Sequence, residues 1–418
     1  MPYCGNCGSY LEEGAAFCGR CGCKVAPPQT GSTNGNNNNN GFGNGNQNQF
    51  NGYSNQTNGY GNQANGYGNQ CYGYGNQGYG YGNQSNGAGT QGNGGFVGGL
   101  NEYMGNTNAV SLNWKDLFTD VFKKHTNVEA EDVFICGTSK TTPPLSEVSE
   151  TWPRPWLYSR VFLCFAITYV LLYICCWIFG NPNALPGAII VGSFTVPFTT
   201  LVLFMEVNAF RNISVYDVMK YFLIGGCASL VVTLFLFNLD VVDTNLSTTW
   251  GAMMVGVIEE LGKLAIVYIL IKRLPSCNYI LSALLAGACV GAGFAAFESA
   301  GYAFRSFLSL GWDGMTSNIY LRGILAPGGH VAWAAVSGAA LVLAKGPGPL
   351  SMDVFSKGRF WKIFAIPVVL HGLWDAPILE GYLKLTALVI LIWIVVLILI
   401  NMGLDEVKKL KNTQNSAA

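Results

Sequence analysis

Charged side chains are scarce in this chain. Only 11% of its 418 residues are charged, and 23 Lys and Arg are balanced by 23 Asp and Glu, whereas soluble proteins are about 25% charged. This shortage excludes an ordinary soluble enzyme, and the lack of a basic excess excludes a protein that binds nucleic acids through their phosphates. The start of the chain also lacks an apolar signal-peptide segment, since Cys4, Gly5 and Asn6 stand there. We therefore do not expect a secreted disulfide scaffold.

Cysteines are present at metal-ligand spacing near the N-terminus. Four of the 13 Cys form two C-x-x-C pairs that are ten residues apart: Cys4, Cys7, Cys18 and Cys21. We expect residues 1–26 to form a small zinc ribbon with one structural zinc ion; the alternative, two disulfides, would need an oxidising compartment. The segment resembles zinc ribbons at the N-termini of many bacterial membrane proteins. With Arg20 and Lys24 as its basic residues, it is expected to bind an unidentified cytoplasmic partner and no nucleic acid.

Aliphatic residues are nearly absent from the next part of the chain. Residues 27–110 consist largely of Asn, Gly, Gln and Tyr, which cannot bury enough surface to offset chain entropy, so we predict a disordered low-complexity linker. Residues 111–155 are predicted to be a juxtamembrane amphipathic segment, because Trp114, Phe118 and Phe122 share one helical face.

Long apolar runs fill the remainder and predict an all-α polytopic membrane protein. Runs of about 20 residues, enough to cross a bilayer, occur near 161–179, 185–205, 218–238, 250–271, 279–304, 323–344, 361–380 and 385–403. They predict an eight-helix membrane core over residues 156–404, followed by a cytoplasmic tail at 405–418.

Basic residues orient these spans. The odd-numbered loops contain only Arg305, Arg322 and Lys384, whereas most other Lys and Arg of the core stand in the even-numbered loops and at both ends. By the positive-inside rule both termini are cytoplasmic. We expect a multi-pass protein of the cytoplasmic membrane of a bacterium, in contact with the lipid bilayer.

Few ionisable residues lie within the spans, and these are the candidate site: Glu259, Glu260, Lys263, Glu298, His330, His371 and Asp375. Each costs roughly 2.5–3.5 kcal/mol to insert, so such residues mark function. Glu206, at the end of the second span, is either functional or interfacial.

Spacing and depth connect these residues. Lys263 follows Glu259 by four positions and Glu260 by three, so one ammonium can neutralise one carboxylate while the other stays free. At ~1.5 Å per residue, Glu259, Glu298, His330 and His371 lie ~10–13 Å below the outer ends of their spans; for His330 we measure from Arg322. Antiparallel helices thus place the polar groups in one layer, in the outer half of the bilayer.

Carboxylates and imidazoles without a thiol or hydroxyl nucleophile suit hydrolysis by activated water. The H-E-x-x-H motif of site-2-type metalloproteases and the G-x-G-D motif of presenilin-type proteases are absent. A rhomboid-like serine at Ser337 lacks the preceding glycine. The set could also be a buried network that only holds the helices together.

Four motifs on successive spans carry a specific resemblance: Glu259-Glu260-x-x-Lys263, Phe294-x-x-x-Glu298, His330-x-x-Trp333 and His371-x-x-Trp374-Asp375. Over roughly residues 155–403 the chain resembles the PrsW family of intramembrane proteases, relatives of the CAAX prenyl endopeptidases and bacteriocin-processing enzymes. The resemblance implies cleavage of membrane-anchored proteins, single-span substrates such as anti-sigma factors, by a glutamic or metallo mechanism. Glu298 stands where the prenyl-peptidase branch has His, which argues against CAAX substrates, and Asp375 stands where other relatives have Asn or His.

The residue roles stay open at this stage. Glu259 or Glu260 is the general base, and its neighbour is held by Lys263. His330, His371 and Glu298 either bind a second zinc ion or hold the water and stabilise the oxyanion. Two other functions are open: a proton-coupled transporter, which should show internal repeats, and a non-catalytic membrane adaptor that recruits partners through its zinc ribbon.

Overall fold

The computed structural model describes residues 95–106, 108–138, 140–274, 276–378 and 381–417. The expected zinc ligands Cys4, Cys7, Cys18 and Cys21 and the linker up to residue 94 lie outside these ranges. Within them every regular element is helical, as expected for an all-α protein.

The elements follow one another in this order: α1 (Phe96–Tyr103), α2 (Asp116–Thr119), α3 (Asn127–Ile135), η1 (Leu145–Glu147), α4 (Leu157–Trp177), η2 (Pro182–Ala184), α5 (Leu185–Val207), α6 (Val215–Lys220), the π-helical η3 (Tyr221–Gly225), α7 (Gly226–Asn238), α8 (Thr249–Arg273), α9 (Ile280–Leu325), η4 (Ala326–Gly328), α10 (His330–Lys345), η5 (Met352–Ser356), α11 (Gly358–Asp375) and α12 (Tyr382–Ala417).

Five segments in the described part are long and apolar enough to cross a membrane: Leu157–Trp177, Pro182–Val207, Val215–Asn238, Ile280–Lys345 and Tyr382–Ser416. The protein is therefore a multi-pass membrane protein. α8 and α11 are less apolar because they carry charged residues, Glu259, Glu260 and Lys263 in α8 and Arg359, Lys362 and Asp375 in α11. The fourth segment contains both α9 and α10, so hydropathy by itself does not reproduce the expected eight spans.

The start of the folded unit differs from the sequence-based expectation. The composition predicts a linker that includes residues 96–110, but these residues contain α1, and Met104 and Val110 are buried. The two buried side chains, Met104 and Val110, pack this segment against the core. The amphipathic helix expected near residues 114–122 is reduced to the four residues of α2, where Leu117 is buried and Phe118 is exposed.

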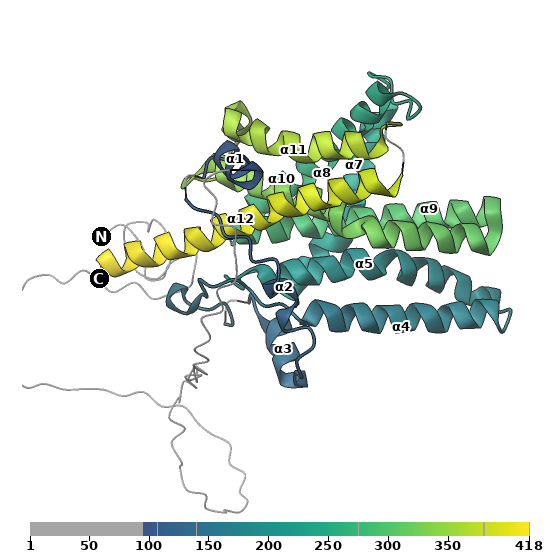
Figure 1. Cartoon of the computed structure of the whole chain (residues 1–418), viewed down its shortest axis with the longest axis horizontal. Helices are drawn as coiled ribbons and strands as arrows, with labels where there is room; N and C mark the ends of the chain where they lie inside the picture. Colours follow the sequence, from purple (N-terminus) through teal and green to yellow (C-terminus); the bar gives the residue numbers. More distant parts are fainter. Residues whose placement is uncertain (1–94, 107, 139, 275, 379–380, 418) are drawn as a thin grey trace, which may run out of the picture. The chain divides into compact units, whose positions relative to one another are not determined.

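α9 does not end where the fifth span was expected to end. Its helical turns run to Gly311, whose φ of 68° and ψ of −152° break the helix, and then resume to Leu325. A positive φ of this kind favours glycine, which has no Cβ. Arg322 contacts Glu298 and Ser299, so the two arms of α9 run back along each other; Figure 1 shows them side by side. The expected loop at 305–322 is therefore mostly a helical hairpin.

The sixth expected span, 323–344, is broken. The second arm of α9 ends at Leu325, η4 follows, and α10 starts at His330. Pro327 has no N–H to continue a helix, and its carbonyl oxygen accepts a hydrogen bond of 3.1 Å from Trp393 Nε1 of α12. Irregular backbone inside a membrane is tolerated where protein satisfies it in this way. The break places His330 in the first turn of α10.

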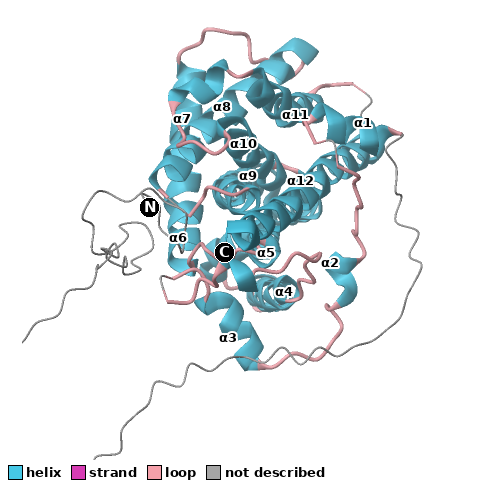
Figure 2. Cartoon of the chain, turned by 90° about the vertical axis from the view of Figure 1, so that its left-hand side faces the viewer, coloured by secondary structure: helices cyan, strands magenta, loops and turns pink. Residues whose placement is uncertain are grey.

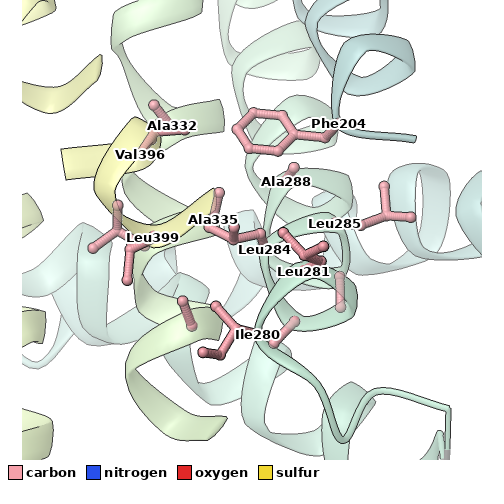
Figure 3. Packing of buried hydrophobic residues seen from close by; sticks show 14 of the residues in the cluster. Phe204, Ile280, Leu281, Leu284, Leu285, Ala288, Ala332, Ala335, Val396 and Leu399 are labelled. Carbon is pink, nitrogen blue, oxygen red and sulfur yellow. The ribbon is translucent and has the colours of Figure 1, made fainter. Parts of the chain in front are cut away.

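α9 lies in the middle of the helices and packs against α5, α7, α8, α10 and α12, as Figure 2 shows end-on. Figure 3 shows the packing of Leu281, Leu284 and Ala288 of α9 with Ala335 of α10 and Leu399 of α12. A Cβ added at Gly287 or Gly291 would collide with the backbone of Ala334 or His330. Glycine there lets α9 and α10 approach closely, which sets the position of His330.

Candidate active site

The expected site residues meet where α8, α9, α10 and α11 pack together. Glu259, Glu260 and Lys263 come from α8, Glu298 from α9, His330 from α10, and His371 and Asp375 from α11. Each of them lies within 4 Å of another member of the set. These contacts bring the set together, but the depth predicted for His330 is counted from Arg322, which contacts Glu298 and Ser299 and does not mark the outer end of a span.

Lys263 lies at the centre of this cluster and is fully buried. Its Nζ is 2.7 Å from Glu260 Oε1, 2.9 Å from His330 Nδ1 and 3.5 Å from Glu259 Oε2. The ammonium also lies 4.2 Å from the centroid of the Phe294 ring, a distance at which cation–π attraction is significant. One cation thus holds groups from three helices.

Glu260 holds the imidazole of His371. Oε1 of Glu260 lies 2.9 Å from His371 Nδ1, and since a carboxylate only accepts hydrogen bonds, Nδ1–H donates. Trp333 stacks on the same imidazole, with ring centroids 4.3 Å apart. A Cβ on Gly256 would meet the backbone of Gly372, so a close crossing of α8 and α11 one turn away brings these two residues together.

Glu298 holds the second imidazole, and Arg322 holds Glu298. His330 Nε2 lies 3.0 Å from Glu298 Oε2. Arg322 forms an ion pair with the same carboxylate and donates from Nε to Ser299 Oγ at 2.8 Å. Sequence reasoning missed Arg322 and placed it in an outer loop; the available signal was a cation eight residues before His330 in an otherwise uncharged stretch.

Nε2 of His371 and Nδ1 of His330, the nitrogen bonded to Lys263, both face Glu259. His371 Nε2 lies 3.6 Å and His330 Nδ1 3.9 Å from Glu259 Oε2. This buried oxygen has no hydrogen-bond partner among the described residues. Asp375 stands at the edge of the cluster, where its Oδ2 is 3.5 Å from His371 Nε2.

Three side chains of the cluster are spaced to hold a metal ion, which would have to replace Lys263 at Nδ1 of His330. One ligand atom each from Glu259, His330 and His371 lies within 4.8 Å of the others, and two imidazoles with one carboxylate are a zinc-type donor set. Glu260 and Glu298 bind the opposite ring nitrogens, as carboxylates do behind metal-bound histidines. Sequence reasoning put Glu298 in the donor set; in the structure Glu259 faces the imidazoles, while Glu298 is occupied by Arg322 and His330.

Glu206 is not part of this cluster. Its carboxylate accepts hydrogen bonds from the backbone N–H groups of Trp156, Leu157 and Tyr158 at 2.8–2.9 Å. These are the orphan donors at the start of α4, which a carboxylate stabilises. The residue ties α4 to the end of α5 and is structural.

Buried carboxylates, two oriented imidazoles and a multi-pass helical fold are the features expected of an intramembrane hydrolase. The comparison with protein families agrees: residues 215–400 match the model of the PrsW family intramembrane metalloproteases. The matched part runs from α6 into α12 and supports a relationship to this family of intramembrane proteases. Comparisons with curated proteins and with solved structures found no match.

Proposed function

We propose that the protein is an intramembrane endopeptidase that hydrolyses a peptide bond of single-span, membrane-anchored proteins with water activated by Glu259. The observation that carries this proposal is the convergence of Glu259 Oε2 with Nε2 of His371 and Nδ1 of His330, the latter also bonded to Lys263. Anti-sigma-factor-like proteins, the substrate class implied by the family resemblance, are the proposed substrates.

Contacts favour Glu259 over Glu260 as the proton acceptor. Glu260 is fully buried, and its Oε1 is held by Lys263 and His371. Glu259 retains some exposure, with 11% of its side chain accessible, although its Oε2, like Oε2 of Glu260, is buried and makes no hydrogen bond within the described residues. A general base must reach water, and the partly accessible side chain of Glu259 is better placed for this than the fully buried side chain of Glu260.

The imidazoles are oriented by their carboxylate partners. Because Nδ1–H of His371 donates to Glu260, its Nε2 keeps a lone pair directed to the site. If Glu259, His330 and His371 held zinc, the ion would supply Lewis-acid polarisation of the scissile carbonyl, and the Glu259 oxygen that binds it would no longer be free to act as the base. α10 starts at His330, and the first turn of a helix leaves N–H groups without intrahelical partners. These donors and the positive end of α10 would stabilise negative charge on the carbonyl oxygen.

The proposed topology puts both termini in the cytoplasm and the polar layer in the outer half of the bilayer, within eight membrane-crossing helices. A substrate must unwind there, because an intact helix hides its carbonyls in backbone hydrogen bonds. We therefore place the cut in the outer half of the substrate span or just outside it. The zinc ribbon is proposed to bind a cytoplasmic partner.

Reconstitution with a library of single-span proteins tests the proposal. The wild-type chain should cut at least one member, and mass spectrometry of the product N-terminus should place the cut in the outer half. Glu259→Gln should abolish cleavage, whereas Glu131→Gln, the same change on exposed α3, should leave it unchanged. Undiminished cutting when both Glu259 and Glu260 are Gln, or a cut on the cytoplasmic side, would refute it.

A further inference from the structure

A cavity of about 490 Å³ opens beside the site. It lies between the returning arm of α9, the end of α11, the start of α12 and the connection from α7 to α8. Its lining includes Leu246, Leu321, Asp375, Tyr382, Lys384 and Leu385.

Two residues connect this cavity to the imidazoles. Asp375 lines the cavity, and its Oδ2 is 3.5 Å from His371 Nε2. Trp374 also lines it and packs edge-on against Trp333, whose ring stacks on His371. A peptide bound in the cavity would therefore be separated from the imidazole of His371 only by the side chain of Asp375 or Trp374.

The lining mixes apolar and polar groups, and two of the polar groups are charged. Leu246, Leu321 and Leu385 supply aliphatic surface, while Asp375 and Lys384 supply charge. The ammonium of Lys384 donates to the carbonyl oxygens of Trp374 and Ala376 at 3.0 and 2.9 Å. These bonds fix the end of α11, since a lysine can satisfy the last carbonyls of a helix.

This combination suits a peptide better than a lipid tail. Charged groups in contact with hydrocarbon are costly, whereas an unwound peptide has N–H and C=O groups that must find partners inside the membrane. A helix about 10 Å wide with a rise of ~1.5 Å fills ~120 Å³ per residue. The cavity thus holds roughly four residues, a short segment and not a complete span.

We propose that this cavity is the substrate-binding cleft, which receives about four unwound, mainly apolar residues beside the scissile bond, with Leu321 limiting the size of the side chain accepted. The inference rests on the proposed function. It adds the site at which the peptide binds and the residue that sets its specificity.

Binding can be tested separately from cleavage. In the full-length Glu259→Gln chain, the photo-crosslinker p-benzoylphenylalanine replaces either Leu321 or Ile324, which is on the same arm of α9, is 78% exposed and is not part of the lining. The probe is a synthetic Leu/Ala span with a Gly-Pro break in its outer half. We expect crosslinking to this probe at position 321, at least about fivefold more than at position 324 and than to an unbroken Leu/Ala span.

Cleavage gives the second measurement. Leu321→Trp should lower kcat/KM for a library substrate at least tenfold, mainly through KM, while Ile324→Trp should stay within twofold of wild type. Leu321→Ala should accept larger residues beside the cut. Equal crosslinking at positions 321 and 324, capture of lipid in place of the probe, or unchanged cleavage by Leu321→Trp would overturn the cleft. Loss of all proteolysis with retained crosslinking at 321 would instead refute the proposed chemistry.

Discussion

Nζ of Lys263 lies 2.9 Å from Nδ1 of His330. An ammonium only donates hydrogen bonds, so Nδ1 accepts, and the proton of a neutral imidazole must be on Nε2, where it is donated to Glu298. Lys263 thereby fixes the tautomer of His330. It also occupies the nitrogen that a metal ion would need, because the other nitrogen is bound to the carboxylate.

Lys263→Met should therefore have opposite effects on stability and metal affinity. Without metal it leaves buried carboxylates unpaired, and we expect a loss of about 3–5 kcal/mol in unfolding free energy. Removing a unit charge at ~4 Å is worth ~4 kcal/mol at an effective dielectric constant of ~20, so zinc should bind more than tenfold tighter. Zinc titration and thermal melts of the chain lacking residues 1–94 measure both. Weaker zinc binding would contradict the competition.

Arg322 and Glu298 form a second ion pair, and this pair holds His330 in place. Arg322→Gln should leave Glu298 without its cation and release His330, and changes of this kind behind a ligand cost about 10–100-fold in activity or metal affinity. Arg322→Lys should recover part of the loss. Steady-state cleavage and zinc affinity are the measurements, and a change in the melting temperature alone would show a purely structural role.

Glu260→Gln should weaken rather than abolish cleavage. It removes the charged acceptor for Nδ1–H of His371 but keeps a side-chain carbonyl oxygen of the same shape, so we expect a fall in kcat of about 10–100-fold. Glu259→Gln in the same membranes provides the comparison. Equal and complete loss in the two variants would contradict the assignment of separate roles.

The close packing of α9 on α10 predicts a sharp contrast between glycines of one helix. Gly287→Ala drives a Cβ into the backbone of Ala334 and should destabilise the protein by about 1–3 kcal/mol, the usual cost of overpacking. Gly301→Ala, in the same helix with nothing within 4 Å of the added Cβ, should be neutral or stabilise by up to ~1 kcal/mol. Thermal melts in detergent measure the pair, and equal effects would contradict the close approach.

Truncation tests where the folded unit begins. Deleting residues 1–94 should leave an inserted, folded core and remove one zinc ion per chain, if the two C-x-x-C pairs bind zinc. Deleting residues 1–104 removes α1 and Met104, which is fully buried, and should lower unfolding free energy by about 2–5 kcal/mol. Elemental analysis and thermal melts check these outcomes. Equal stability of both truncations would show that α1 does not contribute.

The sequence revealed the polar layer because ionisable residues in apolar runs are easy to recognise and span depth follows from counting. It could not choose between Glu259 and Glu260, since adjacent positions differ by about 100° around a helix and the crossing at Gly256 decides which one meets His371. Arg322 was missed for a different reason. In the sequence, a basic residue of an outer loop cannot be distinguished from one in a helical hairpin that folds back on the core. The bend at Gly311 places Arg322 in such a hairpin.

The hairpin of α9 has a consequence for register. Arg322 reaches Glu298 only because the arm from Trp312 to Arg322 returns in phase with the first arm. Each residue added to that arm would turn the guanidinium by about 100° and shift it by ~1.5 Å. The length of the hairpin, whose tip is remote from the site, thus determines the direction in which Arg322 points. An insertion of one residue should separate Arg322 from Glu298. An insertion of seven, about two full turns, would restore the direction of the side chain but not its depth.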